Sequence, residues 1–331
     1  MLQGLSIAEN STENSEQERI NVNKNSKAFS PAGISSFFEI CDKTVNGKSL
    51  TNLEQVGARG GGFGIQKGVT TYVNVSEAED NNIQVFINDK IAPKAETTKT
   101  VVKMLLDKVD RTHNVVVKHK VEIPIGAGFG SSAAGALTTA LALSRALGLN
   151  LTYNQLGRIA HVAEVKCKTG LGTVGPLMLG GCVLTIEPGA PGIAIIDRIP
   201  ISSDYVIVAG VFGHIPTKEV LSSPEKRLAV NKWGRKTLEN ILSEPSLGNF
   251  LTCCREFAEK TGFTTERVRK LMRLADKADA IGVAQNMVGE AVHALTTSGN
   301  AEKVVQAFKQ VLPQNKILVA KMDIQGARLI G

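Results

Sequence analysis

The chain has 331 residues, 43% of them apolar and 21% charged, with a formal net charge of +7. This is the composition of an ordinary globular protein, and at roughly 150 residues per domain the length predicts about two domains. No segment approaches the ~18 consecutive apolar residues that cross a bilayer, which argues against a membrane partner. The basic residues are scattered and aromatic side chains make up only 5%, so no stacking platform for a nucleic-acid partner is expected.

The N-terminal segment is polar and shows no apolar periodicity. Residues 1–26 are rich in Asn, Ser, Glu and Gln, which predicts a disordered tail, because such a segment cannot bury a core. The tail has neither the apolar stretch of a signal peptide nor the arginine-rich face of a transit peptide, so we expect a cytoplasmic protein. The five cysteines lack CxxC spacing and the five histidines lack HExxH spacing, so neither disulfides nor a zinc site is expected.

From residue 27 onward, strand and helix patterns follow one another up to a glycine-rich stretch. Alternating apolar residues predict strands, and apolar residues three and four apart predict helices. Thr152 and Gln155 form a capping-box pattern at the start of one helix. In chain order the expected elements are strands over 68–75 and 83–87, a helix over 97–109, a strand over 114–125, a helix from 131 or 132 to 147, a helix from 152, and a strand over 182–186.

A turn cluster, Pro-Gly-Ala-Pro-Gly at residues 188–192, precedes a second series of elements. Strands and helices mix without strict βαβ alternation, so the expected fold class is α+β with two lobes. We place an N-terminal domain at 27–195 and a C-terminal domain at 196–331. The expected elements of the second series are a strand over 205–212, helices near 217–232, 247–260 and 264–278, strands over 281–284 and 291–295, a helix over 301–312, and a strand over 316–322.

Between a predicted strand and a predicted helix, the residues from Pro124 to Ala134 form the string PIGAGFGSSAA. Phosphate binding requires backbone N–H groups that converge on one anion, and glycines permit the positive-φ turns and the close approach that this needs. A helix that starts at Ser131 or Ser132 adds free N–H groups and the positive end of its dipole. The string therefore predicts a nucleotide-phosphate loop. Its expected contacts are Pro124, Gly126, Gly128, Gly130, Ser131, Ser132 and Ala133.

Two other nucleotide-binding loops do not fit this string. A Walker A loop would end in Gly-Lys-Ser or Gly-Lys-Thr, and a Rossmann fingerprint would be GxGxxG, whereas here GxGxG runs into Ser-Ser-Ala. The remaining alternative is a glycine-rich turn before a helix that is capped by ordinary serines. The full string at the start of a helix favours the phosphate loop over that turn.

The string resembles the second motif, PxxxGLGSSAA, of the GHMP kinases, which are named for galactokinase, homoserine, mevalonate and phosphomevalonate kinases. Phe129 stands where that motif has Leu. The resemblance implies a nucleotide-binding N-terminal lobe like a ribosomal protein and a ferredoxin-like C-terminal lobe. It also implies a kinase that uses ATP and Mg²⁺, with Ser132 and Glu164 as the residues that hold the metal. Without the resemblance, Glu164 would be expected to be an exposed helix carboxylate beside Lys168.

Further segments resemble one branch of this family, the archaeal pantoate kinases. That branch implies phosphorylation of (R)-pantoate by ATP to (R)-4-phosphopantoate, for coenzyme A synthesis. A kinase for another small hydroxy acid (homoserine, shikimate or mevalonate) and a basic nucleic-acid-binding protein stay open as alternatives. A homodimer is an expectation that the sequence does not decide. The segments that carry this resemblance are 28–38, 57–64, 169–176, 187–192 and 323–328.

Three positions depart from the family pattern. Thr173 stands where many GHMP kinases carry a catalytic aspartate, and its hydroxyl cannot act as a base at neutral pH. Residues 285–289, Gln-Asn-Met-Val-Gly, keep one glycine of the third family motif, and Gly33 stands where many pantoate kinases carry histidine. These departures leave the identity of a general base open and do not affect the phosphate loop.

Arg59 is the expected ligand of a substrate carboxylate. It lies in Gly-Ala-Arg-Gly-Gly-Gly-Phe-Gly over 57–64, where the neighbouring glycines would let a ligand reach both the guanidinium and the backbone. Arginine offers a planar pair of donors that matches a carboxylate. The alternative is a turn arginine that points into solvent. The expected catalytic residues are therefore Ser132, Glu164 and Arg59.

Overall fold

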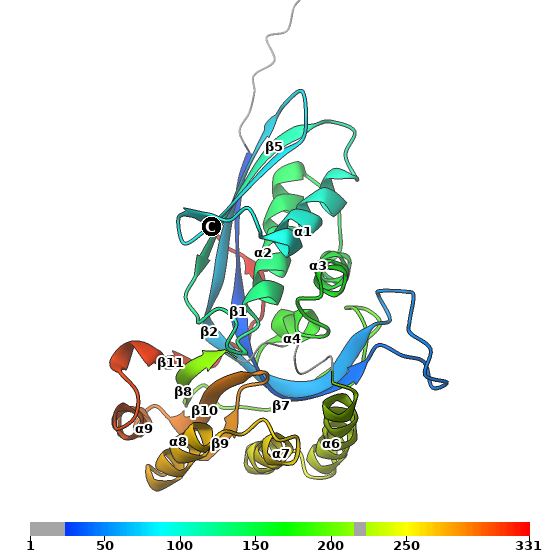
Figure 1. The fold of residues 1–331 in the computed structure, drawn as a ribbon. Helices are drawn as coiled ribbons and strands as arrows, with labels where there is room; N and C mark the ends of the chain where they lie inside the picture. Colours follow the sequence, from blue (N-terminus) through cyan, green and yellow to red (C-terminus); the bar gives the residue numbers. More distant parts are fainter. Residues whose placement is uncertain (1–23, 215–222) are drawn as a thin grey trace, which may run out of the picture.

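The computed structural model describes residues 24–214 and 223–331 and arranges them as two β-sheets with helices packed against them (Figure 1). The larger sheet has the strand order β12-β1-β2-β5-β3-β4, with β6 paired to β2 and β7 paired to β6. The smaller sheet has the order β11-β8-β10-β9. The predicted α+β class with two lobes is confirmed.

The larger sheet, with α1, α2 and α3 on one face, comes mostly from the first half of the chain (Figure 1). The predicted capping box on Thr152 is confirmed. Four of the elements, β1, β4, α4 and β7, have no counterpart among the strands and helices predicted in chain order. The elements are β1 (Lys24–Cys41), β2 (Gly57–Glu77), β3 (Asn82–Ile87), β4 (Lys90–Ile91), α1 (Glu96–Leu106), β5 (His113–Val121), α2 (Ser131–Leu147), α3 (Tyr153–Cys167), α4 (Val174–Leu179), β6 (Cys182–Glu187) and β7 (Ile195–Ile199).

The second half supplies the smaller sheet and the helices beside it. The helix predicted near 217–232 begins at Pro224 and continues to Ser243, and residues 217–222 of that prediction lie outside the described ranges. The elements are β8 (Tyr205–His214), α6 (Pro224–Ser243), α7 (Leu247–Lys260), α8 (Glu266–Lys277), β9 (Gly282–Gln285), β10 (Gly289–Thr297), α9 (Ala301–Lys309), a 3₁₀ turn (Gln314–Lys316), β11 (Ile317–Lys321) and β12 (Arg328–Leu329).

The two predicted domain boundaries can be compared with these elements. Lys24 to Ser26 already belong to β1, while residues 1–23 of the predicted tail lie outside the described ranges. The boundary between 195 and 196 falls at the start of β7, which pairs with β6 in the larger sheet. The division at 195 stays a prediction. Within 24–214 and 223–331, no helix has both the length and the apolar composition needed to cross a membrane.

The antiparallel pair of β1 and β2 runs from the upper lobe to the lower one (Figure 1). The glycines of β2 make this long pairing possible. A Cβ on Gly62 would collide with the carbonyl of Ile34, and a Cβ on Gly60 would lie 2.5 Å from the carbonyl oxygen of Phe37. The sequence predicts that these glycines admit a ligand, but in the structure β1 occupies the space beside them.

The larger sheet is completed by the segment from 322 to 329. Its last strand, β12, pairs antiparallel with β1. The Asp323 backbone N–H donates to the Gly64 carbonyl at 2.9 Å, and the Asp323 carbonyl accepts from the Gly181 N–H at 2.6 Å. The buried Asp323 carboxylate also forms an ion pair with Arg328 at 3.0 Å. The N-terminal lobe is therefore built from residues at both ends of the described chain.

Four phenylalanines join the lobes in one apolar core. Phe37 of β1 packs edge-to-face on Phe250 and Phe257 of α7, with ring centroids 6.1 and 6.3 Å apart. Phe63 of β2 packs on Phe250 at 5.1 Å. Such pairs contribute about 0.5–1.5 kcal/mol each beyond the area that they bury. The core therefore stabilises the relative position of the two lobes.

Two histidines lie inside the protein with hydroxyl or amide partners. His119 of β5 accepts or donates hydrogen bonds with Thr71 at 2.7 Å and Thr98 at 3.0 Å. Burial lowers the pKa of His119 to about 4 and that of His293 to about 3. Both rings are therefore neutral in the folded state at neutral pH.

We expect the free energy of unfolding to fall as the pH drops below about 6.5. The unfolded chain binds protons on these histidines near pH 6.5, while the folded chain resists them down to about 4 at His119 and about 3 at His293. Each histidine therefore contributes up to about 1.4 kcal/mol of lost stability per pH unit in that window. Urea titrations between pH 7.5 and 4.5 measure this loss, and an unchanged unfolding free energy would contradict it.

Candidate active site

The predicted phosphate loop, residues 124–130, joins β5 to α2. Three of its glycines adopt left-handed backbone angles, with φ of +80° at Gly126, +77° at Gly128 and +63° at Gly130. A residue with a side chain rarely adopts this region, so a substitution at any of the three would strain the loop. Phe129 between them is 1% exposed and anchors the loop in the apolar core.

The first turn of α2 presents backbone N–H groups that no side chain caps. Gly130 is the N-cap residue, and the first turn holds no acidic side chain. The positive end of the helix dipole is therefore not neutralised by the helix itself. An anion such as a phosphate group would be stabilised there by both the N–H groups and the dipole.

Two other segments hold the phosphate loop in place. The Gly33 N–H of β1 donates to the Phe129 carbonyl at 3.1 Å. The turn at residues 285–289 lies on the other side, since a Cβ on Gly128 would be 3.1 Å from the Cβ of Asn286. The loop therefore contacts both lobes and lies at the junction between them.

Glu164 of α3 lies beside the start of α2 and is 2% exposed. Burial raises the pKa of its carboxyl, and hydrogen bonds from Ser132 and Thr169 partly oppose that rise. A Cβ on Gly170 would collide with the carboxylate, so a side chain there would push the carboxylate out of its present position. The alternative that Glu164 is an exposed helix carboxylate is wrong.

Ser132 and Glu164 fit a magnesium ion. Both offer hard oxygen ligands, which Mg²⁺ prefers, and the structure brings them within hydrogen-bonding contact. No group of three His, Cys, Asp or Glu side chains that could hold a metal occurs within 24–214 and 223–331. Magnesium sites in phosphate-transferring enzymes commonly use one or two protein ligands together with substrate phosphates. The two residues would match such a site.

Two departures from the family pattern meet at the phosphate loop. A Cβ on Gly33 would lie 3.3 Å from the methyl group of Thr173, and a Cβ on Gly130 would lie 2.8 Å from the same methyl. Thr173 therefore packs its methyl against the backbone of β1 and of the loop. A side chain at position 33 would collide first with Leu177, at 2.9 Å, and would also crowd Thr173.

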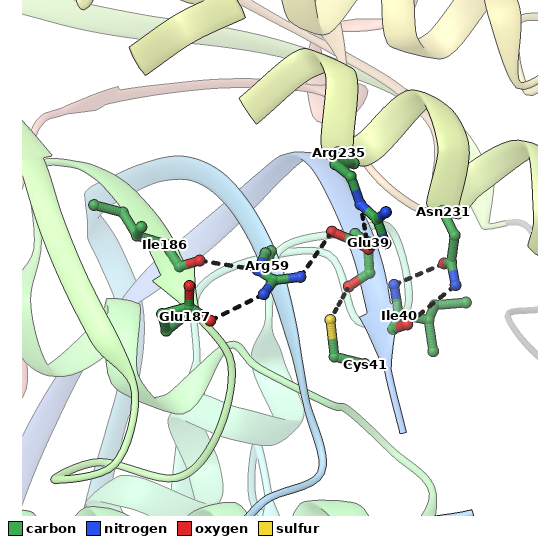
Figure 2. A network of polar contacts seen from close by, with 8 residues as sticks. All are labelled: Glu39, Ile40, Cys41, Arg59, Ile186, Glu187, Asn231 and Arg235. Atoms are coloured by element: carbon green, nitrogen blue, oxygen red, sulfur yellow. Dashed lines mark hydrogen bonds and ion pairs between the residues drawn. The ribbon is translucent and has the colours of Figure 1, made fainter. Parts of the chain in front are cut away.

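Arg59 lies in β2, and its guanidinium already has three acceptors (Figure 2). Its Nε donates to the carbonyl of Ile186 at 3.0 Å. Its two terminal nitrogens contact Glu39 at 3.3 Å and Glu187 at 2.9 Å. The alternative of a turn arginine that points into solvent is wrong. The expected role on a substrate carboxylate stays a prediction.

Glu39 connects Arg59 to helix α6 (Figure 2). Its carboxylate is 3% exposed and also accepts from Arg235 of α6 at 2.8 Å. Asn231, one turn earlier on α6, bonds both the N–H and the carbonyl of Ile40 at 2.9 and 3.1 Å. The end of β1 is thus held by α6 on one side and by Arg59 on the other.

A family model for the N-terminal domain of GHMP kinases matches residues 96–181, which include the phosphate loop, α2 and Glu164. A pantoate kinase from Thermococcus kodakarensis is 35% identical over 288 residues, which cover 86% of this chain and 92% of that protein. The chain belongs to the GHMP kinase family. GHMP kinases use ATP, so ATP is the nucleotide expected for this member.

Two further proteins are similar to this GHMP kinase over most of its length. A pantoate kinase from Methanocaldococcus jannaschii is 29% identical over 287 residues, covering 87% of this chain and 98% of that protein. A solved structure described as a phosphotransferase related to the CoA biosynthesis pathway is 31% identical, with a TM-score of 0.82. It covers 92% of this chain and 98% of its own. The similarity therefore includes both lobes.

The sequence did not indicate three residues that shape this site. Thr169 and Gly170 were part of a segment that resembles the family, but only the structure shows that both contact Glu164. Asn286 lies in a segment that departs from the third family motif, and nothing in its spacing indicates contact with the phosphate loop. These contacts depend on how distant segments pack.

We expect Glu164→Gln to stabilise the GHMP kinase in the absence of nucleotide. Because burial raises the pKa of the carboxyl, ionisation lowers stability as the pH rises from about 4.5 through the folded pKa, and an amide avoids this. The melting temperatures should coincide near pH 4.5, and the variant should melt about 3 °C higher or more at pH 8.

Thermal melts of the two chains at both pH values measure the difference. Glu239→Gln, at an exposed position of α6, is the control and should not change the melting temperature. A Glu164→Gln chain that melts at or below the wild-type temperature at pH 8 would contradict the expectation.

Proposed function

We propose that this GHMP kinase transfers the γ-phosphoryl group of ATP to the primary hydroxyl of (R)-pantoate, giving (R)-4-phosphopantoate for coenzyme A synthesis. The observation that carries the proposal is the similarity to the Thermococcus kodakarensis pantoate kinase, which extends over most of both chains. The uncapped start of α2 and its left-handed glycine loop support a phosphate site in the matched region. The proposed site for the ATP phosphates is therefore this loop together with the first turn of α2.

In the proposed reaction, the phosphate loop and the first turn of α2 bind the phosphates of ATP. The proposed contacts are those predicted from the sequence, and backbone N–H groups supply most of the donors. Ser132 and Glu164 would hold Mg²⁺, which when bound neutralises charge on the β- and γ-phosphates. Gly170 gives the Glu164 carboxylate the room that it needs.

The transfer itself requires little from a protein base. The pantoate hydroxyl oxygen forms a bond to the γ-phosphorus, the bond from that phosphorus to the β-phosphate oxygen breaks, and ADP leaves. The transition state is loose, so positioning and charge stabilisation supply most of the rate. Thr173 cannot accept the proton at neutral pH, so the hydroxyl proton passes to water or to a phosphate oxygen. Thr173 would then position the acceptor rather than ionise it.

For the acceptor, we propose that the pantoate carboxylate binds Arg59. The substrate carboxylate would replace Glu187 as a partner of Arg59, because the Glu187 side chain is 49% exposed. The buried Glu39 would keep its ion pair with Arg59. Giving up an exposed ion pair costs at most about 1 kcal/mol. A substrate carboxylate that is enclosed between the lobes could therefore replace Glu187.

The substrate proposal is tested by ADP release with Mg-ATP and a set of acceptors. We expect pantoate to give a rate well above those with pantothenate, homoserine, shikimate and mevalonate. Ser132→Ala is the control and should lower the rate with pantoate about 100-fold, because it removes a proposed metal ligand. A preference for homoserine or mevalonate would reject pantoate and keep the kinase. Salt-sensitive RNA binding without any ADP release would instead favour the nucleic-acid alternative.

We expect Arg59→Lys to raise the KM for pantoate about 10-fold or more while the KM for ATP stays unchanged. Lysine keeps the charge but not the planar pair of donors, and a charge-assisted contact of this kind contributes about 1.5–3 kcal/mol. Arg235→Lys is the matched control, because Arg235 also pairs with Glu39 but lies on α6. Equal KM values for the two variants would show that Arg59 only stabilises Glu39.

A further inference from the structure

A chain of buried hydrogen bonds leads from β1 across β10 to the phosphate loop. The Oγ of Ser36 lies 3.0 Å from Nε2 of His293, and Nδ1 of His293 lies 2.9 Å from Oδ1 of Asn286. All three side chains are fully buried. The three residues come from β1, β10 and the turn between β9 and β10, so this chain links the two lobes.

The single N–H group of the neutral His293 ring determines which atoms donate and which accept in these hydrogen bonds. Burial lowers the pKa of His293 to about 3, so the neutral ring carries one N–H group. Nδ1 donates that hydrogen to Oδ1 of Asn286, and Nε2 accepts from the Ser36 hydroxyl. The edge-to-face contact with Phe63, at a centroid distance of 5.6 Å, holds the ring. The Asn286 amide is therefore held with its oxygen toward His293.

The other half of the Asn286 amide has no such partner. Its Nδ2 is buried and has no hydrogen-bond acceptor within the described ranges. Five buried side-chain nitrogen or oxygen atoms of the described residues have no hydrogen-bond partner. Besides Nδ2 of Asn286 they include the acceptor Oε1 of Gln285. Thr264 contributes a third, and its neighbour Phe263 accepts a hydrogen bond from Nε2 of Gln285 at 3.2 Å. Buried polar atoms in folded proteins are nearly always paired, so the unpaired Nδ2 donor of Asn286 indicates a missing acceptor beside this turn.

The position of the turn identifies what that partner is. Besides the contact between Gly128 and Asn286, a Cβ on Gly289 would lie 2.9 Å from the carbonyl oxygen of Ala127. The Met287 N–H also donates to the Ser35 carbonyl at 2.7 Å, which fixes the turn to β1. A donor with no acceptor, next to a loop built for phosphates, matches a phosphate oxygen.

We propose that Asn286 is a nucleotide-binding residue whose Nδ2–H group donates to a phosphate oxygen, and that His293 and Ser36 are its positioning residues. This inference rests on the proposed nucleotide site, and it does not depend on which acceptor is phosphorylated. Because Nδ2 is enclosed by protein, this contact requires Gly128 to move away from Asn286 as the phosphates enter, while Phe129 stays anchored in the core. The segment that departs from the third family motif thereby gains a function of its own.

Asn286→Asp tests the donor directly. Aspartate keeps an oxygen for His293 but replaces the N–H donors with an acceptor that repels phosphate. We expect the Kd for ADP, measured by calorimetry, to rise at least about 10-fold. Asn231→Asp is the control, because it makes the same change at an amide whose oxygen and NH₂ group each already bond Ile40, and its Kd for ADP should not change. An Asn286→Asp chain that binds ADP as the wild type does would overturn the proposal.

A measurement on the unaltered chain covers the case in which the variant does not fold. In a crystal structure with ADP, Nδ2 of Asn286 should lie within hydrogen-bonding distance of a phosphate oxygen. A water molecule on Nδ2 with no phosphate contact would overturn the proposal. If the wild-type chain binds no ADP, the inference and the proposed function both fail. If it binds ADP but does not phosphorylate pantoate, only the proposed substrate fails.

The positioning role has its own readout. His293→Phe keeps a ring against Phe63 but cannot donate to Asn286, so the amide loses its fixed orientation. We expect the KM for ATP to rise several-fold while the KM for the acceptor stays constant. Equal changes in both KM values would show that His293 stabilises the fold without positioning Asn286.

Discussion

The close pairing of β1 with the glycine-rich β2 is the constraint on which the rest of the structure depends. Side chains at Gly60 and Gly62 would collide with the carbonyls of β1, so the pair forms only because they are absent. β1 in turn contacts three separate parts of the structure around the site. Its Gly33 holds the phosphate loop, its Ser36 begins the buried chain to the other lobe, and its Glu39 binds α6.

The site contains groups that a protein selected only for stability would avoid. Glu164 is a carboxylate in a buried position whose partners are hydroxyl groups, and Asn286 carries a buried donor without an acceptor among the described residues. Three loop glycines hold left-handed angles beside them. Such local conflicts between stability and structure are typical of functional sites, because the ligand completes the interactions. Their concentration around one loop supports the location of the site independently of family similarity.

The sequence predicted those features that are determined by residues close together in the chain. The glycine turn before α2, the start of α2 and the capping box at Thr152 follow from residue types at fixed spacing, and all three are present. That the turn binds phosphate stays a prediction. The partners of Arg59 could not be predicted, because Glu39 and Glu187 are brought to it by strand pairing over 20 and 128 residues of separation. The strand over 68–75 was predicted, but its extension back to Gly57 was missed, because glycines usually indicate turns. Burial of Glu164 likewise follows from packing between helices, which no periodicity in α3 reveals.

The closure of the larger sheet by residues 322–329 has a consequence for how the chain is made. β1 is among the first described segments to leave the ribosome, yet its neighbour β12 is synthesised long after it. The edge of β1 that pairs with β12, the Gly64 carbonyl and the Gly181 N–H lack these partners until residues 323–329 are made. An open strand edge is a template for pairing with other chains. The nascent N-terminal lobe therefore passes through synthesis with an exposed edge, and a chaperone that covers sheet edges would assist it most before release.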